Sequence, residues 1–587
     1  MSTELEKFLA VRDYLLTMPP YEEAREKFQW PHFTKFNWAL DYFDTMAKDN
    51  DQLALIWADE HGNERKVTFE EMRRRSNQVA NFFRNMGLTK GDRVIIMMET
   101  AVELYELMLG IMKAGGAIIP AATSLPPSDI ADRIQRGNVK FAVVHAPFVE
   151  KFNQAGSALE GLKARVVVGD EFEQQCDENA EAEKCWRKFK ESTAYPEDYT
   201  APFITYSTDE LFLFFTSGTT SKPKLVIHTH TSYPVGHLTT MYWVGMQPGD
   251  VHYNISAPGW AKFAWSSFFA PWNAGATILT YRYTKFVAKE VLSIIEKYKV
   301  DTLCAPLSVL KLFLLEDLSQ FNIHLKQFVS AGEPLNPEVV RKIEAAFHVK
   351  VREGYGQTET TALVGTFHGM ERKDGSMGKP APGYNVVLLD EQLSPVPQGQ
   401  DGQISVETYP IRPLGLLQGY DDPERNKQIF KAGWYFTGDT AYADEDGYLY
   451  FVGRTDDVFK SLDYRISPFE VESELMVAEP VMEAAVVPTV DKRDRIVPKA
   501  FIVLKPDYIP SRETALDIFR FIRDNMAPYK RPRVIEFLEA FPKTVSMKVM
   551  RRELRAYDRE KQKKGERGEH EYWETDFAQE LELGKRR

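Results

Sequence analysis

Short apolar runs alternate with stretches of helical spacing through the first two thirds of the chain. We expect strands at residues 94–98, 117–120, 141–145, 165–168, 211–215, 276–280 and 302–305. Helices are predicted between them at residues 68–86, 102–114 and 288–298. Thr68 and Glu71 form a capping box that begins the first of these helices, and Asn336 before Pro337 begins another. Strands that alternate with helices predict an α/β fold with a parallel, doubly wound sheet.

The pattern changes twice toward the C-terminus. Residues 380–450 form short alternating segments rich in Gly, Pro and Asp, which predict a β-rich subdomain. A small α/β unit follows, with expected helices at 468–476 and 514–526 and strands at 484–488, 500–504 and 534–538. The tail from residue 551 is dense in both charge signs and is expected to be helical or frayed. We therefore predict a large N-terminal domain, residues 1–455, and a small mobile C-terminal domain, residues 456–587.

Composition narrows the class of protein. A chain of 587 residues is too long for one core, and its net charge of −12 argues against general nucleic-acid binding, although a local pocket can still be positive. Three cysteines without a CxxC pair indicate neither a disulfide framework nor a zinc site. The N-terminus has no apolar signal core, and the most apolar segment, residues 104–120, is interrupted by Glu106, Lys113 and glycines. We expect a reduced, cytoplasmic protein without a membrane span.

The stretch L-F-L-F-F-T-S-G-T-T-S-K-P-K at residues 211–224 is the first candidate for chemistry. A buried strand runs into a loop of hydroxyls, one glycine and two lysines, which together can bind a phosphate chain. Gly218 allows the backbone to approach a ligand closely. The commoner phosphate loop, G-x-x-x-x-G-K-[ST], is absent. A polar turn after a core strand explains this loop equally well when it is taken alone.

Five further motifs follow in order: S-A-G-E-P at 330–334, E-G-Y-G-Q-T-E at 353–359, Y-F-T-G-D at 435–439, G-R-T-D at 453–456 and F-P-K-T-V-S-M-K at 541–548. With the loop above, the chain resembles the adenylate-forming superfamily of acyl-CoA synthetases, luciferases and peptide-synthetase adenylation domains. The segments P-G-W at 258–260, P-I-R-P at 410–413 and Y-R-I-S-P-F-E-V-E at 464–472 resemble medium-chain acyl-CoA synthetases in particular. Each motif alone is weak, but six in family order across roughly residues 50–555 are specific.

The resemblance implies a site for ATP, AMP and Mg²⁺. Its phosphate-binding residues would be Thr216, Ser217, Gly218, Thr219, Thr220 and Lys224. Thr358 would contact the α-phosphate, Glu359 would hold Mg²⁺, and Lys548 would neutralise charge that builds on the α-phosphate during adenylation. The alternatives are a solvated acid at Glu359 and an ordinary exposed lysine at Lys548.

The resemblance also implies an adenine and ribose site. Its members would be Gly332, Glu333, Pro334, Gly354, Tyr355, Asp439 and Arg454. Tyr355 would stack on the adenine, and Asp439 would accept hydrogen bonds from both ribose hydroxyls. Tyr355 could instead be a core residue, and Asp439 with Arg454 could be a surface ion pair of little energetic value.

Coenzyme A and the acid complete the implied set of ligands. Asp456 corresponds to the hinge about which the small domain rotates, after which residues 464–468 would line the pantetheine tunnel. Arg465, Arg495 and Lys530 are candidates for binding CoA phosphates. Trp260 would face the acyl group, and Gly356 stands where acetate-specific members have a tryptophan. The resemblance therefore implies an acid larger than acetate, with medium-chain, alicyclic and aromatic acids all open.

Four residues depart from glycines usual in the family: Ser221, Asp463, Ser467 and Met547. The predicted function is an AMP-forming acyl-CoA ligase, in either direction, that acts as a monomer or homodimer on a carboxylic acid, ATP and CoA. One alternative is an enzyme that adenylates an acid and loads it on a carrier protein. The other is a nucleotide-binding regulatory protein that has lost turnover, which the glycine replacements would explain.

Overall fold

The computed structural model describes residues 3–169, 185–216, 223–333, 335–455, 457–461, 464–543 and 549–583. Its contacts divide the chain into two compact units. The first unit comprises residues 1–386, 406–435 and 447–449, and the second comprises residues 387–405, 436–446 and 450–587. None of the helices in the described ranges is long and apolar enough to cross a bilayer.

One sheet of the first unit carries the expected phosphate-binding hairpin. Its strand order is β19-β9-β8-β4-β3-β5-β6-β7. The strands are β3 (Arg93–Met97), β4 (Ala117–Pro120), β5 (Val139–His145), β6 (Ala164–Val168), β7 (Trp186–Lys188), β8 (Glu210–Thr216), β9 (Lys224–Thr229) and β19 (Gly419–Tyr420). The strands from β8 to β7 are parallel, whereas β9 and β19 pair antiparallel at one edge. The first strand of the β8–β9 hairpin is therefore itself a buried, parallel strand of this sheet.

A second sheet of the first unit has the order β16-β15-β14-β13-β12-β10-β11-β1-β2. Its strands are β1 (Leu53–Asp59), β2 (Glu64–Thr68), β10 (Val251–Asn254), β11 (Thr277–Arg282), β12 (Thr302–Cys304), β13 (Gln327–Ala331), β14 (Val351–Gly356), β15 (Ala362–Gly365) and β16 (Lys379–Pro380). The central strands are parallel, and β2, β15 and β16 add antiparallel edges. A core of Ile, Val, Leu and Phe side chains lies between this sheet and the helices beside it.

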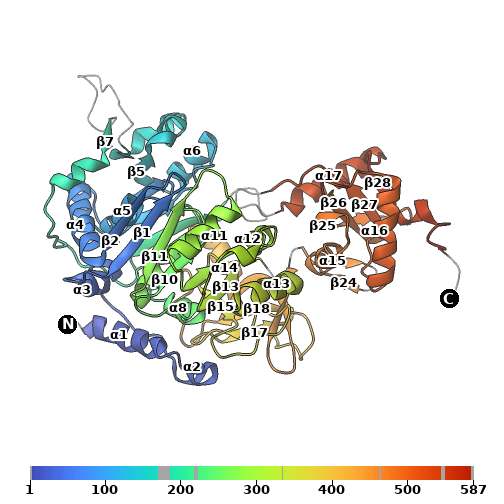
Figure 1. Ribbon diagram of the computed structural model, residues 1–587, viewed down its shortest axis with the longest axis horizontal. Helices are drawn as coiled ribbons and strands as arrows, with labels where there is room; N and C mark the ends of the chain where they lie inside the picture. Colours follow the sequence, from blue (N-terminus) through green and yellow to red (C-terminus); the bar gives the residue numbers. More distant parts are fainter. Residues whose placement is uncertain are drawn as a thin grey trace. The chain divides into compact units, whose positions relative to one another are not determined.

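Helices of the first unit cover the two sheets. They are α1 (Thr3–Leu16), α2 (Tyr21–Lys27), α3 (Asp44–Ala47), α4 (Phe69–Asn85), α5 (Val102–Lys113), α6 (Pro127–Arg136), α7 (Val149–Asn153), α8 (Leu238–Val244), α9 (Ala261–Ala264), α10 (Ala270–Ala274), α11 (Ala288–Lys297), α12 (Leu307–Phe313), α13 (Pro337–Phe347) and α14 (Pro423–Ile429). Helices α4 and α5 pack on each other, and α4 also packs on β1 and β2 (Figure 1). The aromatic N-terminal region also packs into the interior of the first unit, since Trp38 is fully buried and its indole donates to Asn273 at 2.8 Å.

The second unit has its own sheet and core. The sheet order is β25-β26-β27-β28, with β25 (Val481–Val490), β26 (Ile496–Leu504), β27 (Val534–Phe537) and β28 (Glu571–Trp573). Helices α15 (Pro468–Leu475), α16 (Arg512–Asn525) and α17 (Arg551–Lys564) accompany it, with the hairpin β23 (Phe459–Ser461) and β24 (Tyr464–Ile466). Most of β17 (Val386–Leu389), β18 (Gly402–Glu407), β21 (Trp434–Ala443) and β22 (Leu449–Arg454) also belongs to this unit, and β20 (Phe430–Lys431) pairs with β21.

The predicted α/β class with a β-rich segment and a small C-terminal α/β unit is confirmed, and most predicted elements lie within a few residues of their expected bounds. The capping box of Thr68 with Glu71 and the Asn336 cap are present. Residues 186–188, where no strand was predicted, form the edge strand β7. The predicted domain boundary at residue 455 stays a prediction.

Candidate active site

The predicted phosphate-binding segment begins and ends on adjacent strands. Thr216, the last residue of β8, is the ladder partner of Lys224, the first residue of β9. The five residues before Thr216 are buried, as the apolar run predicts. Ser217, Gly218, Thr219 and Thr220 lie outside the described residues. The fold therefore places Thr216 and Lys224 together at one end of a buried strand.

Glu359, the predicted Mg²⁺ ligand, lies beside this hairpin. The hydroxyl of Tyr420 donates a hydrogen bond to Glu359 Oε1 at 2.6 Å. Tyr420 is in turn paired with β9 through strand β19, and its ring lies 5.8 Å from the Lys224 ammonium. Burial and the neighbouring carboxylate raise the pKa of Tyr420, so its hydroxyl keeps its proton and remains a donor. One oxygen of Glu359 is thereby fixed, and its second oxygen is of the type that Mg²⁺ prefers.

His228, on β9, holds the backbone of the predicted α-phosphate contact. Its Nε2 lies 2.7 Å from the carbonyl oxygen of Thr358, and its Nδ1 lies 2.9 Å from the Ser232 hydroxyl. Ser232 accepts a hydrogen bond from the Thr229 amide, which leaves its own hydroxyl hydrogen for Nδ1. Burial lowers the pKa of His228 to about 4. A neutral ring that donates from Nε2 to Thr358 therefore satisfies the whole chain of hydrogen bonds.

The glycines around Tyr355 are required by close packing. Gly354 and Gly365 are ladder partners, and a Cβ on either would come within 2.7 Å of the Trp243 indole. A Cβ on Gly356 would lie 2.3 Å from the carbonyl oxygen of Thr361, a distance no real side chain shows. Tyr355 itself is half-buried, which leaves part of its ring accessible. Gly356 therefore cannot carry a side chain unless the strand pair shifts.

Glu353, at the start of the same motif, is a buried carboxyl group. It is 6% exposed and lies 3.4 Å from the amide nitrogen of Leu335. Burial raises its pKa to about 8, against smaller opposing effects of the Leu335 amide and Arg372. Gly332, in the neighbouring loop, has a φ of +105°, which favours glycine, and both Gly332 and Glu333 are exposed. Pro334 lies outside the described residues.

The raised pKa of Glu353 predicts a pH-dependent cost of folding. The folded state keeps this proton up to about pH 8, whereas an unfolded glutamate loses it near about pH 4.3. Between these values the folded state binds more protons, so the free energy of unfolding falls as pH rises. We expect Glu353→Gln to gain stability relative to the native chain by roughly 1.4 kcal/mol per pH unit over that window. Urea unfolding of both proteins at several pH values measures the difference.

The matched control is Glu338→Gln on α13, where the glutamate is exposed and paired with Lys342. Its difference from the native chain should stay nearly constant over the same pH range. A Glu353→Gln difference that is equally flat would show that Glu353 ionises normally in the folded protein.

Trp260, predicted to face the acyl group, follows a loop that packs on the residues directly after strand β4. Gly259 has a φ of +97°, and a Cβ there would come within 2.5 Å of the Ala122 backbone. Trp260 is half-buried against the apolar core of the first sheet. The hydroxyl of Tyr233 donates to the carbonyl of Ala261 at 3.0 Å and fixes the helix that begins after Trp260. The loop thus presents Trp260 in a defined position.

In the second unit, the predicted ribose-binding pair lies together. Arg454 Nε is 3.5 Å from Asp439 Oδ1, and Asp439 is only 5% exposed. The amide of Thr455, directly after β22, donates to the carbonyl of Gly438 on β21 at 2.9 Å, which joins the end of β22 to the strand that carries Asp439. An ion pair with a buried carboxylate differs from the solvated surface pair that was the alternative interpretation.

The predicted CoA-binding cations are paired within the second unit. Arg495 is exposed and binds Asp491 at 2.6 Å, and Lys530 binds Glu470 at 2.7 Å and also contacts Glu474. A phosphate would have to compete with these carboxylates. The side chain of Arg465, the hinge candidate Asp456 and the catalytic candidate Lys548 lie outside the described residues, as do Ser221, Asp463 and Met547.

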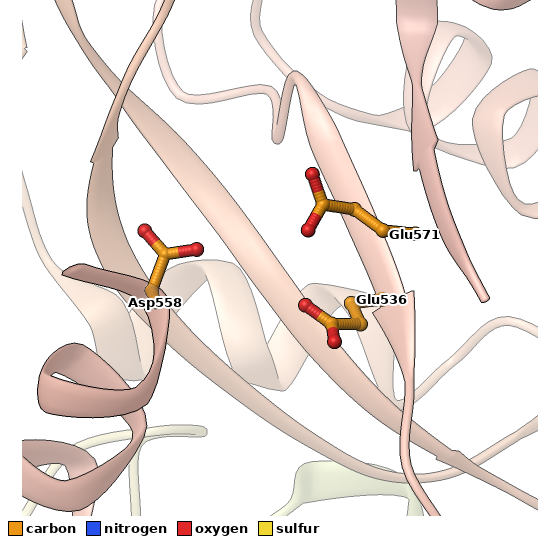
Figure 2. Close-up of side chains that lie close together, drawn as sticks. All are labelled: Glu536, Asp558 and Glu571. Carbon is orange, nitrogen blue, oxygen red and sulfur yellow. The ribbon is translucent and has the colours of Figure 1, made fainter. Parts of the chain in front are cut away.

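A cluster of three acidic side chains in the second unit has the appearance of a metal site. The carboxylates of Glu536, Asp558 and Glu571, from β27, α17 and β28, point toward a common centre (Figure 2). Lys499 Nζ lies at that centre, 2.7, 2.6 and 2.9 Å from the three carboxylates. Lys561 pairs with Glu536 and Glu571 at 2.5 and 2.9 Å. The cluster is therefore a buried ion-pair network that joins the C-terminal helix and strand to the sheet.

Sequence reasoning missed several residues of the site. Tyr420, His228 and Trp243, which contact Glu359, Thr358 and the glycine pair, were not assigned roles. Neither was Glu353, which accepts from the Leu335 amide. Tyr420 is 61 residues from Glu359, and His228 is 130 residues from Thr358. Only the pairing of β19 with β9 and the packing of α8 on the glycines bring these side chains to the motifs. The sequence held only a local signal for two of them: His228 lies on the second strand of the hairpin, and Glu353 is the first residue of its motif.

Comparison with known families identifies both parts of the chain. A model of the AMP-binding enzyme family matches residues 42–420, and a model of the AMP-binding enzyme C-terminal domain matches residues 470–548. The first match alone spans more than half of the chain.

Relatives match over nearly the whole length. The chain is 41% identical to 4-hydroxybutyrate–CoA ligase 1 of Metallosphaera sedula, over 92% of this chain and 93% of that protein. It is 36% identical to the mitochondrial acyl-coenzyme A synthetase ACSM3 of Mus musculus, over 93% and 95% of the two chains. The crystal structure of the anthranilate CoA ligase AuaEII with anthranoyl-AMP superposes with a TM-score of 0.80 at 28% identity, covering 90% of this chain and 98% of that one.

Proposed function

The chain belongs to the AMP-binding enzyme family, and from this membership we infer that it is an AMP-forming acyl-CoA ligase acting on a carboxylic acid larger than acetate. The resemblance inferred from the motifs is confirmed. The observation that carries the proposal is that relatives named as CoA ligases align over more than nine tenths of both chains. Such coverage includes the adenylating unit and the C-terminal unit together.

The proposed reaction has two steps. The carboxylate oxygen of the acid attacks the α-phosphorus of ATP, the bond to the pyrophosphate breaks, and an acyl-adenylate forms. The thiol of CoA then attacks the acyl carbon, loses its proton and releases AMP. In the first step negative charge builds at the α-phosphate, so fixed positive groups and hydrogen-bond donors lower the barrier.

Residues of the first unit support the adenylation step. Lys224 and Thr216 would bind the phosphates, Thr358 would contact the α-phosphate, and Glu359 would coordinate Mg²⁺. The supporting observations are that β8–β9 places Lys224 beside Tyr420, and that Tyr420 holds Glu359 at 2.6 Å. Mg²⁺ bound there would neutralise phosphate charge and orient the pyrophosphate.

Residues of the second unit would complete the site. We propose Asp439 and Arg454 for the ribose, Asp456 as the hinge, and Lys548 as the cation at the α-phosphate. Asp457, next to the proposed hinge, pairs with Arg555 at 2.7 Å, which ties the start of the mobile part to α17. The phosphates of CoA would be bound by Arg465, Arg495 and Lys530. On binding, Arg495 would leave Asp491 and Lys530 would leave Glu470 to pair with phosphate instead.

The expected size of the acid rests on the resemblance, in which acetate-specific members carry a tryptophan at the position of Gly356. This chain has no indole there, and the observed backbone leaves no room for one, because a Cβ would lie 2.3 Å from the carbonyl oxygen of Thr361. The relatives named for 4-hydroxybutyrate and anthranilate act on acids larger than acetate. We propose a short to medium-chain or aromatic acid, in a cytoplasmic enzyme that acts as a monomer or homodimer and runs in either direction.

Pyrophosphate release tests the proposal across acids from acetic to dodecanoic acid and benzoic acid. We expect release with one or more acids larger than acetic acid, followed by CoA-dependent AMP release with the pure protein. Lys548→Ala should lose most adenylation while still binding ATP. The control is Lys543→Ala, in the same segment and paired with Glu483, which should keep its adenylation activity. No release with any acid, despite ATP binding, would favour a regulatory nucleotide-binding protein. AMP release that needs a carrier protein in place of CoA would favour the carrier-loading alternative.

A further inference from the structure

Several buried polar atoms of the first unit have no hydrogen-bond partner among the described residues. One of them is Nε2 of His237, the residue that precedes α8. The side chain is 1% exposed, and its other nitrogen, Nδ1, lies 2.9 Å from the Thr240 hydroxyl. A buried donor or acceptor without a partner is costly and is usually explained by a ligand or an ordered water.

His237 lies between the two elements proposed to border the acid. On one side, Gly356 pairs with Ala362 in the β14–β15 ladder, and the Ala362 amide is 3.5 Å from the same Thr240 hydroxyl that contacts His237. Helix α8 packs on β15 accordingly (Figure 1). His237 is thus separated from the strand pair that carries Gly356 by a single side chain.

On its other side, His237 contacts the segment that begins at Trp260. Its ring is stacked on Trp265 with centroids 6.1 Å apart, and the Tyr233 ring meets it edge-on at 4.4 Å. The Tyr233 hydroxyl binds the carbonyl of Ala261, the residue after Trp260. Trp265 and Ala261 are half-buried, so His237 lies directly beneath a partly accessible surface.

We propose that His237 Nε2 hydrogen-bonds a hydroxyl group on the chain of the acid, so that the enzyme selects hydroxy acids over the corresponding unsubstituted acids. This inference rests on the proposed ligase function and adds the substrate class. Trp265 and Tyr233 surround His237 with aromatic faces, against which an aliphatic chain would pack. A hydroxyl group at the far end of that chain would meet Nε2, a buried group that lacks a partner among the described residues.

The protonation state of His237 suits this role. Burial lowers the pKa of His237 well below its usual value, with a smaller contribution from His228. A neutral imidazole has one donor and one acceptor nitrogen, and a hydroxyl can take either part. Selectivity should therefore not depend on a charged ring, and the preference should persist across neutral pH.

The test compares matched acids in pyrophosphate release. The pairs are butanoic with 4-hydroxybutanoic acid and hexanoic with 6-hydroxyhexanoic acid, together with 3-hydroxy and 5-hydroxy isomers. We expect the native enzyme to favour at least one hydroxy acid by about tenfold or more in kcat/KM. His237→Phe should abolish that preference while retaining activity on the unsubstituted acid, and His237→Gln, which keeps a polar head group, should retain part of it.

The control is His252→Gln, another fully buried histidine, whose two nitrogens contact Thr302 and Ser266. A structural role would lower kcat/KM for both acids of a pair equally, as expected for the control. If the native enzyme turns over unsubstituted acids but prefers none of the hydroxy acids, the inference is wrong and an ordered water satisfies Nε2. If it turns over no acid, the proposed function itself fails. A preference that survives intact in His237→Phe also overturns the inference.

Discussion

Replacement of Lys499 by methionine is expected to destabilise the second unit by roughly 3–5 kcal/mol, because it removes the cation at the centre of three buried carboxylates. Lys499 is 1% exposed, and Glu536, Asp558 and Glu571 are also nearly inaccessible. Burial alone would lower the pKa of Lys499, but the adjacent carboxylates of Asp558 and Glu536 raise it overall, so the ammonium stays charged. After the substitution, Lys561 would still pair with Glu536 and Glu571, whereas Asp558 would keep its hydrogen bonds from Thr489 and Gln562 but lose its ion pair with Lys499.

Hydrogen exchange in the full chain measures this effect strand by strand. Amides of β26 and β27 should lose protection by an amount that corresponds to the predicted free energy, while those of β8 in the first unit should not change. Lys563→Met is the matched control, because Lys563 pairs with Glu560 on the exposed face of α17, and its loss should be within about 0.5 kcal/mol. Equal protection in the two variants would mean that the network contributes nothing to stability.

The second large effect is expected in catalysis. Glu359→Gln should reduce adenylation by about a hundredfold or more, because an amide cannot supply the negative charge that Mg²⁺ needs. The half-saturating Mg²⁺ concentration should rise at the same time. Pyrophosphate release at saturating ATP, with Mg²⁺ varied, measures both quantities.

Tyr420→Phe separates the orientation of Glu359 from its charge. It removes the hydrogen bond to Oε1 but leaves the carboxylate, so we expect a loss of about tenfold, close to the value of one charge-assisted hydrogen bond. Glu424→Gln, at an exposed pair with Lys427 on α14, controls for the loss of a surface charge and should retain full activity. Native Mg²⁺ dependence in Glu359→Gln would remove Glu359 from the metal site.

Local sequence patterns were enough to predict many of the helices and strands and to indicate the family. The run at 211–215 is the buried strand β8, the Thr68 capping box begins α4, and Asn336 caps α13. These features depend on residues within one turn or one strand, so the physical cause is contained in a few adjacent positions. Motifs in family order did the same for function, because each is read from consecutive residues.

Contacts between distant segments decided the rest. Nothing near Glu359 in the sequence indicates that Tyr420 would hold it, and nothing near Thr358 indicates His228. The three carboxylates of the second unit are spread over residues 536–571, and only folding shows that a lysine from another strand lies among them. The sequence by itself indicated many of the helices and strands, the family and the candidate residues that remain predictions. The tertiary structure decided which side chains hold those residues in place. Hydrogen bonds and burial depend on positions in space, and they do not produce a regular spacing of residues that could be recognised in the sequence.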